Sequence, residues 1–377
     1  TGSGGTEDSF GSFEDPPGAE SVDGSGSTGS SGGSGFGAPP FSIYGYLSNR
    51  VIMTVPVDEE GAGKTRWGNT TTLRLKGEWT PEESITFHAE ASYIWNQGQS
   101  SSILLMETLG YPSPLSPINP AITWGDFQQL NPQDNFLGTF NLDHAWGLVS
   151  LGPVDLKLGK FPIAWGTGYV FNPTDRVNQL GSLEGREEET PGTLGIMPSV
   201  MLIDAWGITG YLAFQDRSKR QFILPGDKFI ENYPFGVKVF GVIGSFDLST
   251  GFIKEVFYSP VSEKYQHAYF WGYDFFGAIG DFGIYSEGTV AMPREGNRIA
   301  SQRDYRFFDA LTVTLGGEYN FAKGPSIKLE YFHHGPGSLK KEDYDFTELL
   351  TGQKMVLGRD YLFLYISNTF FDYLETT

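Results

Sequence analysis

The chain contains no cysteine among its 377 residues. This excludes a disulfide-stapled fold, a thiolate zinc site, an iron–sulfur cluster and a cysteine nucleophile. No run of about 18 apolar residues occurs, which excludes a transmembrane helix. The chain opens with neither an initiator Met nor a cationic and apolar leader, so we expect Thr1 to be a processed or trimmed terminus.

Basic residues are scarce, with 26 Lys and Arg against 45 Asp and Glu, which gives a formal net charge of −19. A surface of this sign disfavours binding to a phosphate backbone, so nucleic acid is not an expected partner. Part of the excess lies in residues 1–39, which hold six acidic residues and no basic one. Because this Gly/Ser-rich stretch cannot bury enough apolar surface to order itself, we expect residues 1–39 to be a disordered tether. A calcium-binding tail is an alternative, but the repeated Asp-x-Asp spacing is missing.

From residue 40 to residue 377 the sequence alternates between apolar and polar residues, as β-strands do. Leu73, Leu75 and Trp79 alternate with Arg74, Lys76 and Glu78. Aromatic residues make up 15% of the chain, yet its mean hydropathy is only −0.25. This period of two, with one oily face and one charged face, predicts β-strands throughout.

Fourteen strands are expected, joined by connections that alternate in length. The strands fall near 41–56, 70–80, 84–97, 139–151, 154–165, 197–207, 210–217, 235–244, 247–258, 266–279, 282–292, 308–321, 325–334 and 360–371. Short turns are expected at 80–83, 152–153, 207–209, 245–246, 280–281 and 322–324. Long connections are expected at 57–69, 98–138, 166–196, 218–234, 259–265, 293–307 and 335–359.

Short turns at one end and long loops at the other are typical of a transmembrane up-and-down antiparallel β-barrel. The oily face carries aromatics near strand ends, where membrane-interface girdles lie. These are Trp79, Trp95, Trp146, Trp165, Trp206, Tyr319, Phe321, Phe370 and Phe371. The alternative is a soluble all-β sandwich or jelly roll, whose sheets also alternate.

One segment, Leu158–Asp175 with the sequence LGKFPIAWGTGYVFNPTD, stands apart. The residues that carry a resemblance are Lys160, Ile163, Trp165, Gly166, Gly168, Asn172, Pro173, Thr174 and Asp175. At these positions the chain resembles a broad group of Gram-negative outer-membrane porin-like barrels, many of them uncharacterised. The resemblance implies an outer-membrane barrel that admits or exports carbohydrates and other small solutes, without identifying the solute.

The same segment has a physical interpretation of its own as a loop motif at the barrel rim. Trp165 is expected at the membrane–water boundary, and Gly166 and Gly168 would let the backbone turn sharply. The turn that follows holds Asn172, Pro173 and Asp175, next to Arg176. A structural clasp and a solute-contacting role both remain open for Asn172, Asp175 and Arg176.

The connection 98–138 carries five prolines and many apolar residues, so it is unusually oily for a solvated loop. Long loops without their own strand pattern are commonly functional. We expect it to fold inward and narrow the lumen, with packing against other loops or another subunit as the alternative.

The charged face of the strands predicts the pore lining. The expected residues are Arg74, Lys76, Glu78, His88, Glu90, Asp155, Lys157, Lys160, Lys238, Glu287, Glu318, Lys328 and Glu330. Basic residues gather on early strands and acidic ones on late strands, which suggests a transverse field across the pore. The alternative is an array of lumen ion pairs that holds the wall together.

Signals for catalysis, metal binding and cofactors are weak. The adjacent His333 and His334 would point to opposite faces of a strand, and no nucleophile elbow or phosphate-binding glycine loop is present. We therefore expect no enzymatic activity, no metal and no cofactor.

The resulting hypothesis is a bacterial outer-membrane porin for passive diffusion of small hydrophilic solutes, with a periplasmic N-terminus, lipid as partner and a possible homo-oligomer. Alternatives are a non-conducting structural or surface-polymer-binding barrel, and a soluble carbohydrate-binding or hydrolytic domain. The last strand lacks the usual terminal aromatic, because six residues follow Phe371. The full barrel would have sixteen strands if a final hairpin is missing.

Overall fold

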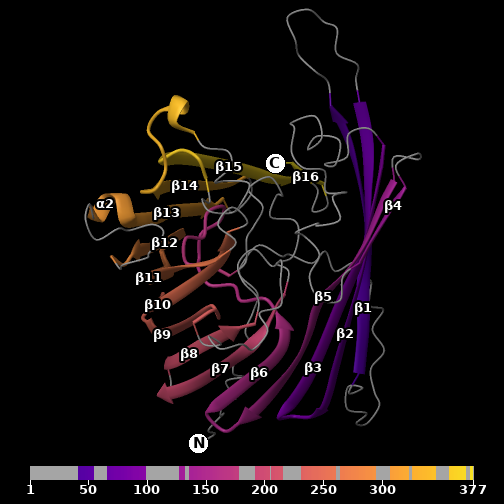
Figure 1. Ribbon diagram of the computed structural model, residues 1–377, viewed down its shortest axis with the longest axis horizontal. Coiled ribbons are helices and arrows are strands. Elements are labelled where there is room, and N and C mark those ends of the chain that lie inside the picture. Colours follow the sequence, from indigo (N-terminus) through magenta and orange to yellow (C-terminus); the bar gives the residue numbers. More distant parts are fainter. Residues whose placement is uncertain are drawn as a thin grey trace, which may run out of the picture. The chain divides into compact units, whose positions relative to one another are not determined.

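The computed structural model (Figure 1) describes residues 41–54, 66–98, 127–131, 136–177, 192–203, 205–214, 231–259, 264–293, 306–321, 325–344, 356–370 and 374–376. The chain divides into a unit at Thr1–Pro39 and a unit at Pro40–Thr377. The predicted tether at 1–39 lies outside the described residues. Within them, no helix is long and apolar enough to cross a membrane.

The second unit is built from one antiparallel sheet in which nearly every strand pairs with its neighbours in sequence. Its first half comprises β1 (Phe41–Thr54), β2 (Arg66–Glu82), β3 (Ile85–Gly98), β4 (Phe127–Asn131), β5 (Phe136–Leu151), β6 (Val154–Phe161), β7 (Thr193–Ile203) and β8 (Trp206–Ala213). Its second half comprises β9 (Phe235–Ile243), β10 (Phe246–Ser259), β11 (Lys264–Ile279), β12 (Phe282–Ala291), β13 (Leu311–Asn320), β14 (Ser326–His334), β15 (Asp360–Phe370) and β16 (Leu374–Thr376). The helices among the described residues are single turns, α2 (Phe307–Ala310) and η2 (Lys341–Asp343).

The prediction of an all-β, up-and-down antiparallel fold is confirmed. Each of the fourteen predicted strands corresponds to one observed strand, and β4 and β16 are additional short strands. Off the main path, β4 pairs only with β5, inside the stretch predicted as loop 98–138.

Several predicted boundaries were wrong by a few residues, and two of them have a clear structural reason. The turn expected at 207–209 lies between Ile203 and Trp206, because Gly207 pairs with Met201 and continues β8. The strand expected at 154–165 ends at Phe161, where the chain leaves the sheet.

Three tight turns each begin with a glycine that has a positive φ angle. Gly152, Gly244 and Gly280 each open a two-residue connection and have φ values of 63°, 63° and 61°. Positive φ at the first turn residue matches the twist of a hairpin, and glycine adopts it without strain. These turns keep one set of strand ends closely joined, while the longer connections leave from the other set.

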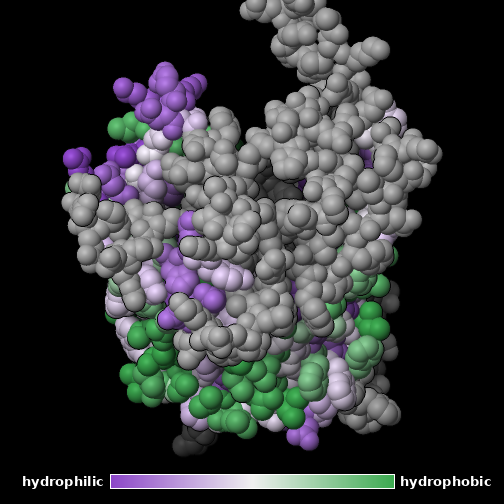
Figure 2. Space-filling model, in the orientation of Figure 1, coloured by the Kyte–Doolittle hydropathy of each residue, from purple (hydrophilic) through white to green (hydrophobic). Residues whose placement is uncertain are grey.

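The two faces of the sheet are inverted relative to a soluble protein. Along β1, Ile43, Leu47 and Val51 are each about two-thirds exposed, at 67%, 67% and 66%. Arg74 and Glu90, which lie on the other face of β2 and β3, are only 4% and 2% exposed. The sheet curls on itself (Figure 1), and the low exposure of Arg74 and Glu90 places the charged face on the inside of the curl. Figure 2 shows apolar side chains gathered on the outside in the lower half of the view, over β6–β8.

The edges of the sheet do not meet among the described residues. One edge of β1 pairs with β2 over all fourteen residues, and its other edge has no described partner strand. At the far end β15 pairs with β16 through only Asn368–Phe370. The described strands therefore form a curled sheet with a seam between β1 and the end made by β15 and β16.

Candidate functional site

The residues that follow β6 form a segment inside the curled sheet, which we call the inner segment (Pro162–Val177). It has no regular secondary structure and touches interior side chains on every strand from β8 to β15. Its first anchor is Trp165, whose ring meets Tyr211 of β8 with centroids 4.8 Å apart. At its far side Tyr169 and Phe171 reach β15, with ring centroids 5.3 Å from Tyr365 and 5.7 Å from Tyr361.

Glu287 of β12 holds one turn of the inner segment through backbone amides. Its carboxylate accepts hydrogen bonds from the amide nitrogens of Thr167, Gly168 at 3.0 Å and Thr174 at 3.2 Å. The side chain is fully buried, at 0% exposed. A buried carboxylate is stable only when it is hydrogen-bonded or paired, and these amides supply that stabilisation.

Glu330 of β14 holds the next part of the segment in the same way. Its two oxygens accept hydrogen bonds from the amides of Tyr169 at 2.6 Å, Val170 at 3.0 Å and Phe171 at 2.9 Å, and from the Tyr285 hydroxyl at 2.9 Å. Six backbone amides of the inner segment thus donate hydrogen bonds to two glutamates, three to each. The inner segment is therefore fixed to the β12–β14 wall rather than loosely inserted.

Side chains lock the two ends of this contact. The Thr314 hydroxyl donates to the Phe171 carbonyl at 2.8 Å, and the Phe171 ring stacks on Phe332 with centroids 4.3 Å apart. Further along, Arg176 donates to the Thr289 hydroxyl at 2.8 Å and lies 4.1 Å from the centre of the Phe270 ring. This cation–π contact and the hydroxyl together hold a buried guanidinium against the wall.

Gly166 occupies a position that no larger residue fits. Its φ is 113°, and an added Cβ would lie 2.2 Å from Oε2 of Glu287. We expect Gly166→Ala to destabilise the fold by about 1–3 kcal/mol, because it adds backbone strain and pushes the carboxylate away from its amide donors. Chemical denaturation of the refolded protein measures this, and Gly152→Ala, where an added Cβ meets nothing within 4 Å, controls for a positive-φ glycine with free space.

For two tryptophans the predicted position at the membrane boundary was wrong. Trp165 is 7% exposed and belongs to a buried interior cluster with Phe161, Ile163 and Tyr211. Trp146 stacks on His88 of the interior face, with ring centroids 5.0 Å apart. Exposed aromatics do lie near the short turns, as Trp79 stacked on Phe87 shows.

Among the predicted pore-lining residues, a first group meets on β2, β3 and β5. Arg74 is ion-paired with Glu90, whose second oxygen lies 3.5 Å from Lys76 Nζ and 3.6 Å from His88 Nε2. His144 Nδ1 lies 3.2 Å from the same oxygen. Sequence reasoning missed His144 and Asp143, because both lie where β5 slips its register by one residue against Glu90 and Ala91.

A second group lies around the remaining wall. Lys328 is 3.3 Å from Glu318 and 4.2 Å from the Tyr169 ring centre. Lys157 lies over Trp146 at 4.5 Å, and Lys238 lies over Trp165 at 5.2 Å. The Glu78 side chain is more open, at 46% exposed, and lies 3.9 Å from His88.

The structure brings the loop-motif residues to the inner segment and leaves other predicted lining residues apart. Asn172, Pro173 and Asp175 form a turn there, closed by the Asp175 amide on the Asn172 carbonyl at 3.2 Å. Lys160 is 1% exposed and Asp155 is partly buried, on β6. Glu287 and Glu330 face inward but are covered by the inner segment, so they do not oppose the basic residues across open space as a transverse field requires.

The predicted constriction at 98–138 lies largely outside the described residues, which in that range are Gly98 at the end of β3, the strand β4 and the start of β5. Sequence reasoning did not predict that Pro162–Val177 would line the interior. The signal was present in Trp165, Ile163 and Phe171, which are too apolar for a solvated rim.

No protein-family model matches the chain, and no curated protein sequence matches it. Loosely similar solved structures include Pseudomonas putida OprB, with 12% identity and a TM-score of 0.45 over 87% of this chain and 84% of that one. Salmonella typhi OmpF in complex with daunomycin has 10% sequence identity and a TM-score of 0.42 over 78% of each chain. The outer membrane channel DcaP of Acinetobacter baumannii has 12% sequence identity and a TM-score of 0.41 over 78% of this chain and 77% of that one. These TM-scores lie below 0.5, so the function is argued from the site alone.

Proposed function

We propose that this chain is a β-barrel pore of a bacterial outer membrane, through which small hydrophilic solutes diffuse passively. The observation that carries the proposal is the inverted sheet, apolar where it is exposed and charged where it is enclosed. Leu362, Leu364 and Ile366 of β15 are 72%, 58% and 50% exposed, while Glu330 and Thr314 inside the curl are 1% and 0% exposed.

Lipid contact explains this inversion physically. In water, each exposed Leu or Ile forgoes about 1.5–3 kcal/mol of burial free energy, so a continuous apolar face is costly there. In a bilayer the same face is satisfied, and a curled antiparallel sheet pairs its backbone groups internally, as a membrane requires. The exposed aromatics near the short turns suit the bilayer interface.

The inner segment supplies the second feature of a pore, namely a narrowed lumen. It covers the interior wall from β8 to β15, so solutes would pass between it and the wall formed by β1–β6. That wall presents Lys76, Glu78 and His88, and partly exposed aromatic and cationic pairs such as Lys157 with Trp146. Lumen width and these charges would set selectivity, with no cofactor and no energy coupling.

Orientation follows from the connections. The short turns would face the periplasm and the long connections the cell exterior. Since β1 begins and β15 ends at the short-turn side, both ends of the sheet, and so the N-terminus, would be periplasmic. In this proposal the barrel is surrounded by outer-membrane lipid and associates into a homo-oligomer.

A second candidate is a non-conducting barrel with a structural or surface-binding role. The observation that favours it is the firmness of the inner segment, whose amides are held by two buried glutamates. A segment fixed in this way can plug a lumen as well as narrow it.

Solute flux separates these candidates. We expect the full chain, refolded into phospholipid vesicles, to release an entrapped neutral monosaccharide faster than protein-free vesicles and to retain an entrapped large dextran. Leakage of both probes would indicate membrane damage rather than a pore. Folded, inserted protein with neither probe released would favour the non-conducting barrel, and protein that stays in solution without detergent would contradict both.

A further inference from the structure

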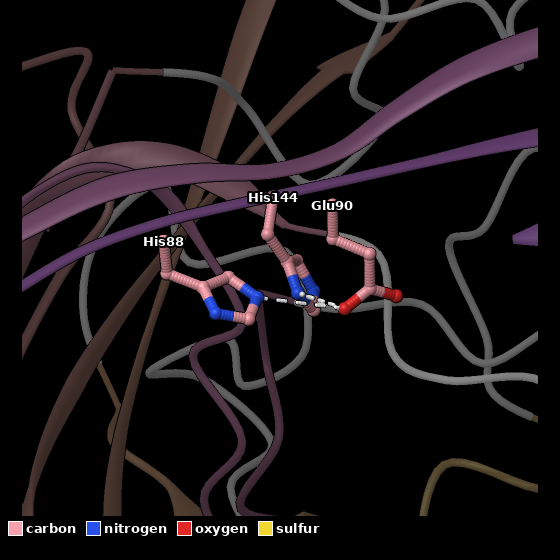
Figure 3. Close-up of side chains that lie close together, drawn as sticks. All are labelled: His88, Glu90 and His144. Atoms are coloured by element: carbon pink, nitrogen blue, oxygen red, sulfur yellow. Dashed lines mark ion pairs between the residues drawn. The ribbon is translucent and has the colours of Figure 1, made fainter. Parts of the chain in front are cut away.

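Three ligand-type side chains from two neighbouring strands converge on the interior wall: His88 and Glu90 of β3, and His144 of β5. Figure 3 shows both imidazole rings directed at the same carboxylate. One ligand atom from each residue lies within 4.8 Å of the others, and Glu90 and His144 are buried. Among the described residues this is the cluster whose spacing suits a metal ion.

The distances match a compact coordination site. In a tetrahedral zinc site, bonds of about 2.0–2.1 Å place neighbouring ligand atoms roughly 3.3–3.4 Å apart. Glu90 Oε2 lies 3.2 Å from His144 Nδ1 and 3.6 Å from His88 Nε2. The two distances to Glu90 need shifts of only a few tenths of an ångström to match this spacing, and the ligand atoms of the two histidines lie within 4.8 Å of each other, so all three atoms can face one ion.

Groups around the three ligands are arranged as a second coordination shell. His88 Nδ1 lies 3.9 Å from Glu78, beyond hydrogen-bond distance, so the Glu78 carboxylate acts on the ring only through its charge, which favours a proton on Nδ1 and the lone pair on Nε2. Arg74 binds the other Glu90 oxygen, Oε1, and so fixes the carboxylate with Oε2 toward the histidines. Trp146 stacks on His88 at 5.0 Å and restrains its ring further.

Neighbouring charges permit a divalent ion. Arg74 and Lys76 contribute two positive charges and Lys157, which lies over Trp146, a third, while Glu78, Glu90 and Asp143 contribute three negative ones, so the surroundings with neutral histidines are close to neutral. The direct competitor is Lys76, whose Nζ lies 3.5 Å from Oε2. Its side chain is 19% exposed and sits on a flexible stem, so it can swing toward the lumen when an ion enters.

We propose that His88, Glu90 and His144 bind one divalent transition-metal ion on the lumen wall, with zinc as the best fit to two imidazoles and a carboxylate. The site would sit beside Lys157 and Trp146, where an ion would change the charge of the passage. This assignment rests on the cluster's own geometry and does not depend on the chain being a conducting pore.

The experiment is calorimetric titration of Zn²⁺ into the full chain folded in detergent micelles. We expect one ion per chain, and affinity losses for His88→Gln and His144→Gln at least as large as the about 10–100-fold cost of disturbing a second-shell residue. His333→Gln is the matched control, because His333 lies on β14 and contacts Asp360 instead, at 2.8 Å. Its affinity should equal that of the parent chain.

A spectroscopic readout keeps the test independent of small folding defects. Co²⁺ in place of zinc should give the intense visible absorption of a four-coordinate site, and that band should vanish in His88→Gln, which leaves the Arg74–Glu90 ion pair intact. Absence of zinc binding by the parent chain would overturn the proposal. So would binding that His88→Gln and His144→Gln leave unchanged, because the ion would then be held by carboxylates elsewhere.

Discussion

Glu330→Gln is expected to release the inner segment from the β14 wall. The glutamine keeps one oxygen but turns an NH₂ group toward amides that need acceptors, so the hydrogen bonds from Tyr169, Val170 and Phe171 cannot all be kept. Lost bonds to a charged acceptor cost about 1.5–3 kcal/mol. At about 1.4 kcal/mol per factor of ten, those amides should exchange their hydrogens roughly ten- to a hundredfold faster.

The control for this variant is Glu318→Gln on neighbouring β13. Glu318 pairs with Lys328 at 3.3 Å, and its side chain is 22% exposed. Its replacement removes an interior charge on the same wall without touching a segment amide, so exchange at 169–171 should stay at the parent rate. Equal protection of these amides in all three proteins would mean that Glu330 does not hold the segment.

Leu75→Arg is expected to block insertion into bilayers, whereas Lys76→Leu is expected to insert. Leu75 is 53% exposed on the outer face of β2, while Lys76 follows it on the inner face beside Glu90. An arginine on the lipid face near the bilayer midplane costs roughly 2–4 kcal/mol. Refolding into vesicles, followed by gel mobility with and without heating, measures the inserted fraction.

This pair of variants tests which face of β2 meets lipid, because positions 75 and 76 are adjacent and face opposite sides of the strand. Lys76→Leu should alter ion selectivity once it is inserted, since it removes a positive charge from the lumen wall. Similar behaviour of the two variants would show that the assignment of faces is wrong. A Leu75→Arg protein that is stable in water without detergent would favour a soluble sheet.

Much of the fold could be predicted from the sequence because its governing signal is local. A period of two assigns each side chain to a face, so the alternation of Leu73 and Leu75 with Arg74 and Lys76 indicated both strand and orientation. Glycine turns then set the hairpins. The errors arose where this signal is weak, as in β7–β8, where a register irregularity between Met201 and Ile203 moved the turn.

The site was harder to predict, because it depends on contacts between residues more than 100 positions apart. Nothing local distinguishes Glu287 and Glu330 from other interior acids, and their role appears only when the inner segment is laid against them. Trp165 was assigned to the boundary by its residue type, but its position after the end of β6 sends it inward. The interior cluster of His88, Glu90 and His144 likewise depends on a strand pairing whose register is not readable from either strand.

Single-channel recording in a planar lipid bilayer tests the central claim most directly, with the parent chain and the double variant Glu287→Gln, Glu330→Gln compared under the same salt. A pore narrowed by the inner segment predicts discrete conductance steps for the parent chain and larger, noisier steps for the variant. Steps of unchanged size in the variant would contradict the inner segment as the constriction. A parent chain that inserts and conducts nothing would contradict the pore itself.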